Sequence, residues 1–298
     1  MLKHYPWKRF WCRSDASYYL GDDGYLTDPD GPSGETRQPH ALSADVLDEV
    51  PCVALWGDPG LGKSTTLHEF RQLAEKRGGV LQEDLAVVTD VNRLRDQLFG
   101  MQFQTWAKST GTLTILLDSL DECLLRHPSV PLMLVDELGR GYPLNRLRLR
   151  IMCRGTEWPA FLTERLSELW GEQGFLTAEL LPLRKCDVEI ATKLEIDVEE
   201  LTVGDFMEEV SLRGMQPFAI RPNSLMMLLD AFRRGGGRLT RNQVEMFRDY
   251  CRTLCIENPS NTRHLLAPSV AGEADQLLAV ARRVAAVTIL SHRPTIIA

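Results

Sequence analysis

The sequence lacks the features that mark several large classes of protein. No apolar run approaches the roughly 20 residues that a membrane-spanning helix needs, and no apolar stretch follows Met1. We therefore expect a cytoplasmic protein with neither a secretory signal nor a membrane partner. The 7 cysteines include no C-x-x-C pair, which argues against a zinc site and favours isolated, reduced thiols. No repeat with a period of roughly 20 to 50 residues occurs, which argues against a solenoid.

An excess of positive charge is also missing. The chain has 34 Lys and Arg residues against 41 Asp and Glu residues, a formal net charge of −7 at pH 7. Because an acidic chain repels phosphate backbones, we do not expect nucleic acid to be its main partner. The length of 298 residues allows one larger domain and one or two smaller helical parts.

One short segment has every fixed position of the phosphate-binding loop pattern G-x-x-x-x-G-K-[ST]. It consists of Gly57, Asp58, Pro59, Gly60, Leu61, Gly62, Lys63 and Ser64. Apolar residues 53–56 precede it and helix-compatible residues 64–70 follow it, which is the strand–loop–helix context that the pattern requires. Glycines let successive backbone N–H groups point at phosphate oxygens, and the helix adds the positive end of its dipole. We expect Lys63 at the β- and γ-phosphates of a nucleotide, the Ser64 hydroxyl on Mg²⁺, and Thr65 as a further nucleotide contact.

Three carboxylates follow a second apolar run. Residues 113–117 are typical of a fully buried strand, Asp118 ends it, and Asp121 and Glu122 come shortly after. Ligands of open α/β sheets bind at the carboxyl ends of the strands, and Mg²⁺ prefers oxygen ligands. We expect Asp118 in the Mg²⁺ shell through water, and Asp121 and Glu122 polarising the water that attacks the nucleotide.

These residues resemble a known family. The run Asp118–Glu122 is similar to the extended acidic motif of NACHT NTPases, members of the STAND class of signal-transducing ATPases built on an AAA+-like core. Residues 147–154 are similar to the sensor-1 strand of that family, whose terminal arginine reads the γ-phosphate; Arg154 is the matching position. Residues 220–229 resemble its small helical domain, where a proline packs near the adenine; Pro222 is the matching position.

The resemblance implies a slow ATPase that acts as a switch. ADP would hold a closed state, and ATP with Mg²⁺ would favour a self-associated one, in a role similar to bacterial signalling or defence. The resemblance also implies a domain order: a nucleotide-binding core, then a winged helix, then a long sensor that binds a protein trigger. We expect this chain to be a fragment or a short relative, because it has room for only the start of the winged helix.

Alternating strand and helix patterns predict an α/β fold: a P-loop NTPase with a parallel sheet, helices on both faces and a small helical domain. The expected division is an N-terminal wrap (1–49), a nucleotide-binding core (50–160), a helical lid (161–258) and the start of a winged-helix segment (259–298). Within it we expect a strand at 85–88, helices near 91–107 and 130–139, a helix break at 235–237, and Thr240 as a helix N-cap.

Two other functions stay open. An AAA+-like motor or loader with steady turnover would need a basic face, and Arg146, Arg148 and Arg150 alternate along one side of a strand that could present it. A small-molecule kinase would use the same phosphate loop. It would also need a lid that binds the acceptor, whereas the Asp121–Glu122 pair favours hydrolysis.

Overall fold

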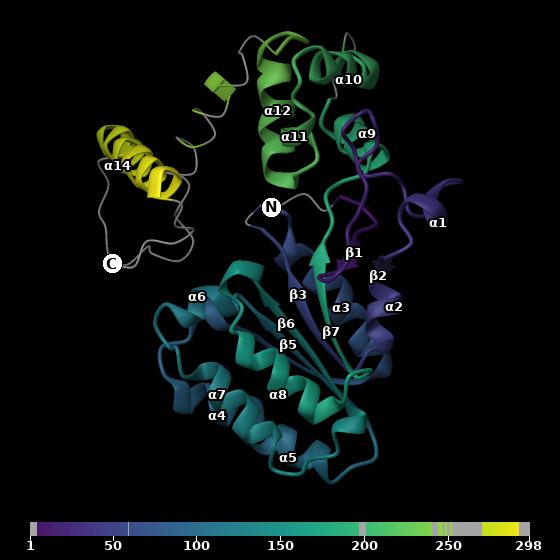
Figure 1. Ribbon diagram of the computed structural model, residues 1–298, viewed down its shortest axis with the longest axis vertical. Helices are drawn as coiled ribbons and strands as arrows, with labels where there is room; N and C mark the ends of the chain where they lie inside the picture. The colour runs from purple at the N-terminus through teal and green to yellow at the C-terminus, as the bar shows by residue number, and fades with distance from the viewer. Residues whose placement is uncertain are drawn as a thin grey trace.

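The centre of the molecule is a seven-stranded, mostly parallel sheet (Figure 1). The computed structural model describes residues 5–58, 60–196, 201–239, 244–246, 248, 251 and 270–291. The strands run in the order β2-β1-β7-β3-β6-β5-β4. Their bounds are β1 Phe10–Arg13, β2 Ala41–Ser43, β3 Cys52–Trp56, β4 Gly78–Asp84, β5 Thr112–Asp118, β6 Leu147–Cys153 and β7 Phe175–Leu180. Strands β7, β3, β6, β5 and β4 are parallel, whereas β1 pairs antiparallel with both β7 and β2.

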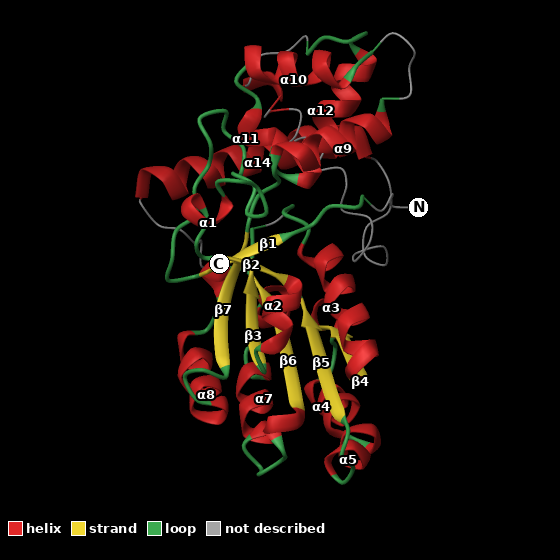
Figure 2. Ribbon diagram, turned by 90° about the vertical axis from the view of Figure 1, so that its right-hand side faces the viewer, coloured by secondary structure: helices red, strands yellow, loops and turns green. Residues whose placement is uncertain are grey.

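Helices cover both faces of the sheet because its central strands are apolar on both sides. In β3, Cys52 and Ala54 point into one apolar cluster, and Val53 and Leu55 point into another. The first cluster packs against α4 Val91–Phe99, α5 Met101–Ala107, α6 Leu120–Leu124, α7 Val130–Leu138 and α8 Ala160–Trp170. The second packs against α2 Ala44–Glu49 and α3 Lys63–Arg77. Figure 2 views the sheet from one face, with strands β7, β3, β6, β5 and β4 side by side.

A separate helical unit lies beyond the carboxyl ends of the parallel strands (Figure 1). It contains α9 Lys185–Glu195, α10 Val203–Leu212, α11 Gln216–Ala219 and α12 Pro222–Arg234, which share an apolar core of their own. Helix α12 ends at Arg234 with Gly235 as its C-cap, so the predicted break at 235–237 is confirmed. Two further helices are α1 Gly34–Arg37 and α14 Val270–Ser291. Thr240 lies outside the described residues, and no helix among those described is long and apolar enough to cross a membrane.

The predicted α/β class, with helices on both faces of a parallel sheet and a following helical part, is confirmed. The sheet reaches beyond residues 50–160, since β1 and β2 come from the N-terminal segment and β7 lies at 175–180. The predicted strand at 85–88 is wrong. Strand β4 ends at Asp84, whose carboxylate accepts from the Ala86 N–H at 3.0 Å and starts a 3₁₀ turn over Leu85–Val87. Strand β4 lies at the edge of the sheet and is largely polar, so its sequence contains no apolar run that would predict a strand.

The arginine cluster does not form an exposed basic face. Arg150 is fully buried and donates to the carbonyls of Leu47 at 3.1 Å and Asp48 at 3.2 Å, with the Asp48 carboxylate 3.5 Å away. Arg148 also donates to the Asp48 carbonyl. These two arginines therefore bind carbonyls in the last turn of α2, where positive charge is stabilised by the helix dipole. The expectation of an exposed sheet face is wrong because β6 is a central strand. The arginine side chains on that side of β6 face the covering helix α2 rather than solvent.

Candidate nucleotide-binding site

The strand order brings the three sequence motifs to one edge of the sheet. Strand β6 lies between β3 and β5, so Arg154, which follows β6, falls between the glycine loop after β3 and Asp118 at the end of β5. Trp56 is in register with Cys153, and Gly57 continues the pairing by donating its N–H to the Cys153 carbonyl at 3.2 Å. Neighbouring strands lie about 4.8 Å apart, so loops that leave adjacent strand ends meet directly.

The glycine loop has the backbone that phosphate binding requires. Gly60 and Gly62 have φ values of +80° and +89°, a region that side-chain-bearing residues rarely adopt. Gly62 is the N-cap of the 15-residue helix α3, and no described side chain caps its first turn. The N–H groups of Thr65 and Thr66 donate to the Gly62 carbonyl at 3.1 Å, which leaves the N–H groups before them for a ligand. The Lys63 ammonium donates to the carbonyls of Gly57 and, at 3.3 Å, of Asp58. Pro59 and the Ser64 side chain lie outside the described residues.

The three carboxylates of the acidic motif differ in burial: Asp118 is half-buried, Asp121 is buried and Glu122 is exposed. Ser119, with a φ of 58°, is the only described residue other than glycine with positive φ, and its N–H donates to the Asp118 carboxylate at 2.8 Å. The tight turn leads into α6, where Asp121 is buried and forms a 2.8 Å ion pair with the guanidinium of Arg154. Glu122, the next residue, is exposed. Backbone strain of this kind gathers at functional sites.

Charges of both signs act on Lys63 from these neighbours. Burial lowers the pKa of its ammonium below the usual value, the carboxylates of Asp121 and Asp118 raise it, and Arg154 lowers it. The sequence predicts that Lys63, Asp118, Asp121 and Arg154 lie at one site. In the structure Asp118, Asp121 and Arg154 are close enough to Lys63 to act on its charge. Thr65, two residues beyond Lys63 on α3, is exposed.

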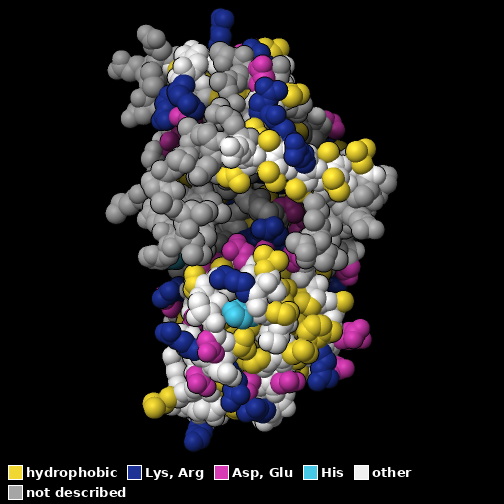
Figure 3. Space-filling model, turned by 90° about the vertical axis from the view of Figure 1, so that its left-hand side faces the viewer, with side chains coloured by type: hydrophobic (Ala, Val, Ile, Leu, Met, Phe, Trp, Pro, Cys, Tyr) yellow, Lys and Arg dark blue, Asp and Glu magenta, His cyan; other side chains and the backbone are white. Residues whose placement is uncertain are grey.

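The helical unit touches the glycine loop directly. The Arg221 guanidinium forms a 3.2 Å ion pair with the Asp58 carboxylate, and the Asn223 N–H lies 3.5 Å from the Gly60 carbonyl. Pro222, the first residue of α12, is buried, and a Cβ at Gly62 would lie 3.7 Å from it. Figure 3 shows charged side chains of both signs along the hollow between the two parts. Sequence reasoning missed Arg221 and Asn223, although both flank the proline that the family resemblance had marked.

The residues present fit a nucleoside triphosphate with Mg²⁺. Positive-φ glycines, uncapped N–H groups and a lysine bonded to the loop's own carbonyls form a phosphate cradle. Within the described part of the chain, no group of three or more His, Cys, Asp or Glu side chains could hold a metal ion alone. Mg²⁺ at nucleotide sites uses one or two carboxylates together with waters and phosphate oxygens. Asp118 and Ser64 would supply the protein oxygens.

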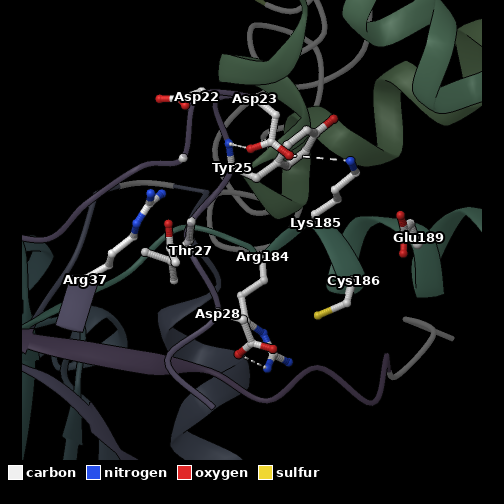
Figure 4. Close-up of a pocket in the computed structure, with 12 residues that line it drawn as sticks. Asp22, Asp23, Tyr25, Thr27, Asp28, Arg37, Arg184, Lys185, Cys186 and Glu189 are labelled. Carbon is white, nitrogen blue, oxygen red and sulfur yellow. Dashed lines mark hydrogen bonds and ion pairs between the residues drawn. The ribbon is translucent and has the colours of Figure 1, made fainter. Parts of the chain in front are cut away.

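A second cavity, of about 560 Å³, lies between residues 21–37 and the start of α9 (Figure 4). Its charged groups largely neutralise one another. Arg184 is bonded to Asp28 at 2.9 Å and to Asp187 at 2.8 Å, and Lys185 pairs with Asp23 at 3.4 Å. The pairs with Asp28 and Asp23 fasten the N-terminal segment to the helical unit, and none of the lining residues belongs to the glycine loop.

Known proteins offer only distant similarity. No protein-family model matches the sequence, and no curated protein matches it. The structure is similar to a RuvB mutant from Thermotoga maritima, at 15% sequence identity and a TM-score of 0.41, over 79% of this chain and 76% of that one. It is also similar to Cdc6p from Pyrobaculum aerophilum, at 13% identity and a TM-score of 0.40, over 78% of this chain and 74% of that one. Neither similarity extends to activity.

Proposed function

We propose that this chain binds and slowly hydrolyses ATP with Mg²⁺, and that it works as a nucleotide-dependent switch of the NACHT type. The observation that supports the switch is the contact between the helical unit and the glycine loop, through Arg221–Asp58 and Asn223–Gly60. A nucleotide bound in the glycine loop changes the contacts that the loop makes with the helical unit, so the two parts of the molecule change conformation together.

Each residue of the site has a proposed task. Backbone N–H groups from Gly60 to the first turn of α3 bind phosphate oxygens, and Lys63 binds the β- and γ-phosphates. Bound Mg²⁺ supplies charge neutralisation at those phosphates. Glu122, exposed beside the site, orients the attacking water. Arg154 reads the γ-phosphate, and it must exchange its bond to Asp121 for one to phosphate to do so.

The two nucleotides would favour different states. ADP leaves Arg154 paired with Asp121, whereas ATP offers that guanidinium a more highly charged partner. Such a difference in contacts is what a population shift requires. We extend the proposal to self-association in the ATP state, response to a protein trigger, and signalling in bacterial defence; these rest on the motif resemblance to NACHT proteins.

A steadily turning-over AAA+-like motor or loader is the alternative. Its expected basic face loses support because Arg150 is buried and Arg148 is bonded to α2.

The first test identifies the nucleotide that the purified full chain carries, by chromatography after denaturation. We expect ADP in near-stoichiometric amount and slow turnover of added ATP. An empty site with rapid multiple turnover would favour the motor, and no binding of ATP at all would refute the site.

A further inference from the structure

Arg9 lies buried beneath the glycine loop, although it comes from a segment about fifty residues upstream. One terminal nitrogen of its guanidinium donates to the Leu61 carbonyl at 2.8 Å, and the other donates to the Leu181 carbonyl at 2.7 Å. The residue is only 5% exposed. Its side chain thus joins the glycine loop to the chain that follows β7. A guanidinium suits this task because its planar fork holds two acceptors at fixed geometry.

The charge of Arg9 is not neutralised by a salt bridge. Within the described residues no carboxylate lies within ion-pair distance of its guanidinium, and the nearby Asp187 is already bonded to Arg184. Burial lowers the pKa of Arg9 to about 10, while the more distant charges of Asp187 and Glu69 raise it and that of Arg184 lowers it. A buried cation without a paired anion is costly, and an anion bound nearby would offset part of that cost.

The guanidinium also stands directly behind the start of α3. A Cβ added at Gly62 would lie 3.3 Å from the Arg9 terminal nitrogen, so this side chain fills the space against the glycine that caps the helix. In a planar trans peptide the C=O and the N–H point in opposite directions. Because Arg9 holds the Leu61 carbonyl on the inner side, the Gly62 N–H of the same peptide points toward the ligand side of the loop.

We propose that Arg9 is a positioning residue of the phosphate site. It sets the Leu61–Gly62 turn so that the first N–H groups of α3 point at phosphate, and its charge adds to the positive potential there. This inference rests on the proposed function, since it names a further residue of the same site.

Neighbouring contacts keep the segment in place when Arg9 is changed. The Trp7 indole N–H donates to the Asp187 carbonyl at 2.9 Å, and β1 begins at Phe10. Arg13, at the end of the same strand, is exposed and pairs with Asp15 at 3.0 Å, which makes Arg13→Gln a matched control.

The test uses the full chain with Arg9→Gln, Arg9→Lys and Arg13→Gln. Titration calorimetry with Mg²⁺ gives the dissociation constant of ATP, and competition against ATP gives that of tripolyphosphate. Hydrogen bonds from a charged group correspond to roughly a 10- to 100-fold change in affinity. We expect Arg9→Gln to weaken ATP and tripolyphosphate by the same 10- to 100-fold factor, Arg9→Lys to weaken both less, and the control to bind like the wild type.

The melting temperature of the nucleotide-free variants separates positioning from folding. The inference would be overturned if Arg9→Gln had a lowered melting temperature but unchanged affinities. If Arg9→Gln does not fold, the same result in Arg9→Lys would overturn it. Unchanged ATP affinity in Arg9→Gln, under conditions in which Lys63→Ala weakens ATP binding, would also overturn the inference. That result would leave the proposed function standing. Failure of the wild type to bind ATP would overturn both.

Discussion

Replacing Glu122 by Gln should stop ATP hydrolysis without weakening ATP binding. The side chain is exposed on α6, whereas the neighbouring carboxylate of Asp121 is buried and bonded to Arg154 at 2.8 Å. An amide keeps the size of Glu122 but cannot accept a proton, and acid–base groups contribute roughly 10²- to 10⁴-fold to a rate. That range corresponds to about 2.7–5.4 kcal/mol of activation free energy.

Asp121→Asn should act differently. The Arg154 side chain is 43% exposed and the Asp121 side chain 7%, so their pair falls between an exposed pair, worth about 0.2–1 kcal/mol, and a buried one, worth about 3–5 kcal/mol. We expect a loss of about 1–2 kcal/mol in the free energy of unfolding and a smaller fall in turnover than for Glu122→Gln.

The assay is steady-state phosphate release, with ATP affinity and urea unfolding measured on the same samples. Glu164→Gln, an exposed glutamate on α8, serves as the control. Near-normal turnover in Glu122→Gln, or a loss of ATP affinity as large as its loss of turnover, would refute the division of labour between the two carboxylates.

Three further changes test other parts of the site. Lys63→Ala removes the charge that we propose binds the phosphates and should weaken ATP roughly 10- to 100-fold by calorimetry; unchanged affinity would refute the assignment. Asp48→Ala leaves Arg150 buried without its carboxylate, also breaks the 2.5 Å pair of Asp48 with Arg77, and should cost about 3–5 kcal/mol in urea unfolding, whereas a loss below about 1 kcal/mol would show that the backbone carbonyls suffice for Arg150. Arg221→Ala breaks an exposed pair with Asp58, so stability should change by less than about 1 kcal/mol while release of a fluorescent ADP accelerates; an unchanged release rate would contradict the contact's role in the switch.

The sequence allowed prediction of those features that depend on local pattern. Residues 113–117 form a buried apolar run and became the centre of β5, and the glycine loop was found through a fixed spacing. Both are short-range signals, since buried strands and positive-φ turns impose their own residue types. The helix break at Gly235 is of the same kind.

Features that depend on distant partners could not be predicted. Arg150 alternates with apolar residues in the same way as an exposed strand arginine, and only the position of α2 over β6 shows that it is buried. Strand β4 is polar because it is an edge strand, so no apolar run marks it. Arg9 and Arg221 carry no local signal, because their partners lie 52 and 163 positions away in the chain.

Three of the cations around the site, Lys63, Arg154 and Arg221, share one property that bears on how a switch could work. Lys63 is bonded to the loop's own carbonyls, Arg154 to Asp121, and Arg221 to Asp58, so each has an internal partner that phosphate would have to replace. A shift from 1:99 to 99:1 between two states needs about 5.5 kcal/mol of differential binding. Charge-assisted contacts of about 1.5–3 kcal/mol each would reach that total only if most of the three exchange together. A switch in this chain therefore requires coupling between the sheet edge, which holds Lys63 and Arg154, and the helical unit, which holds Arg221.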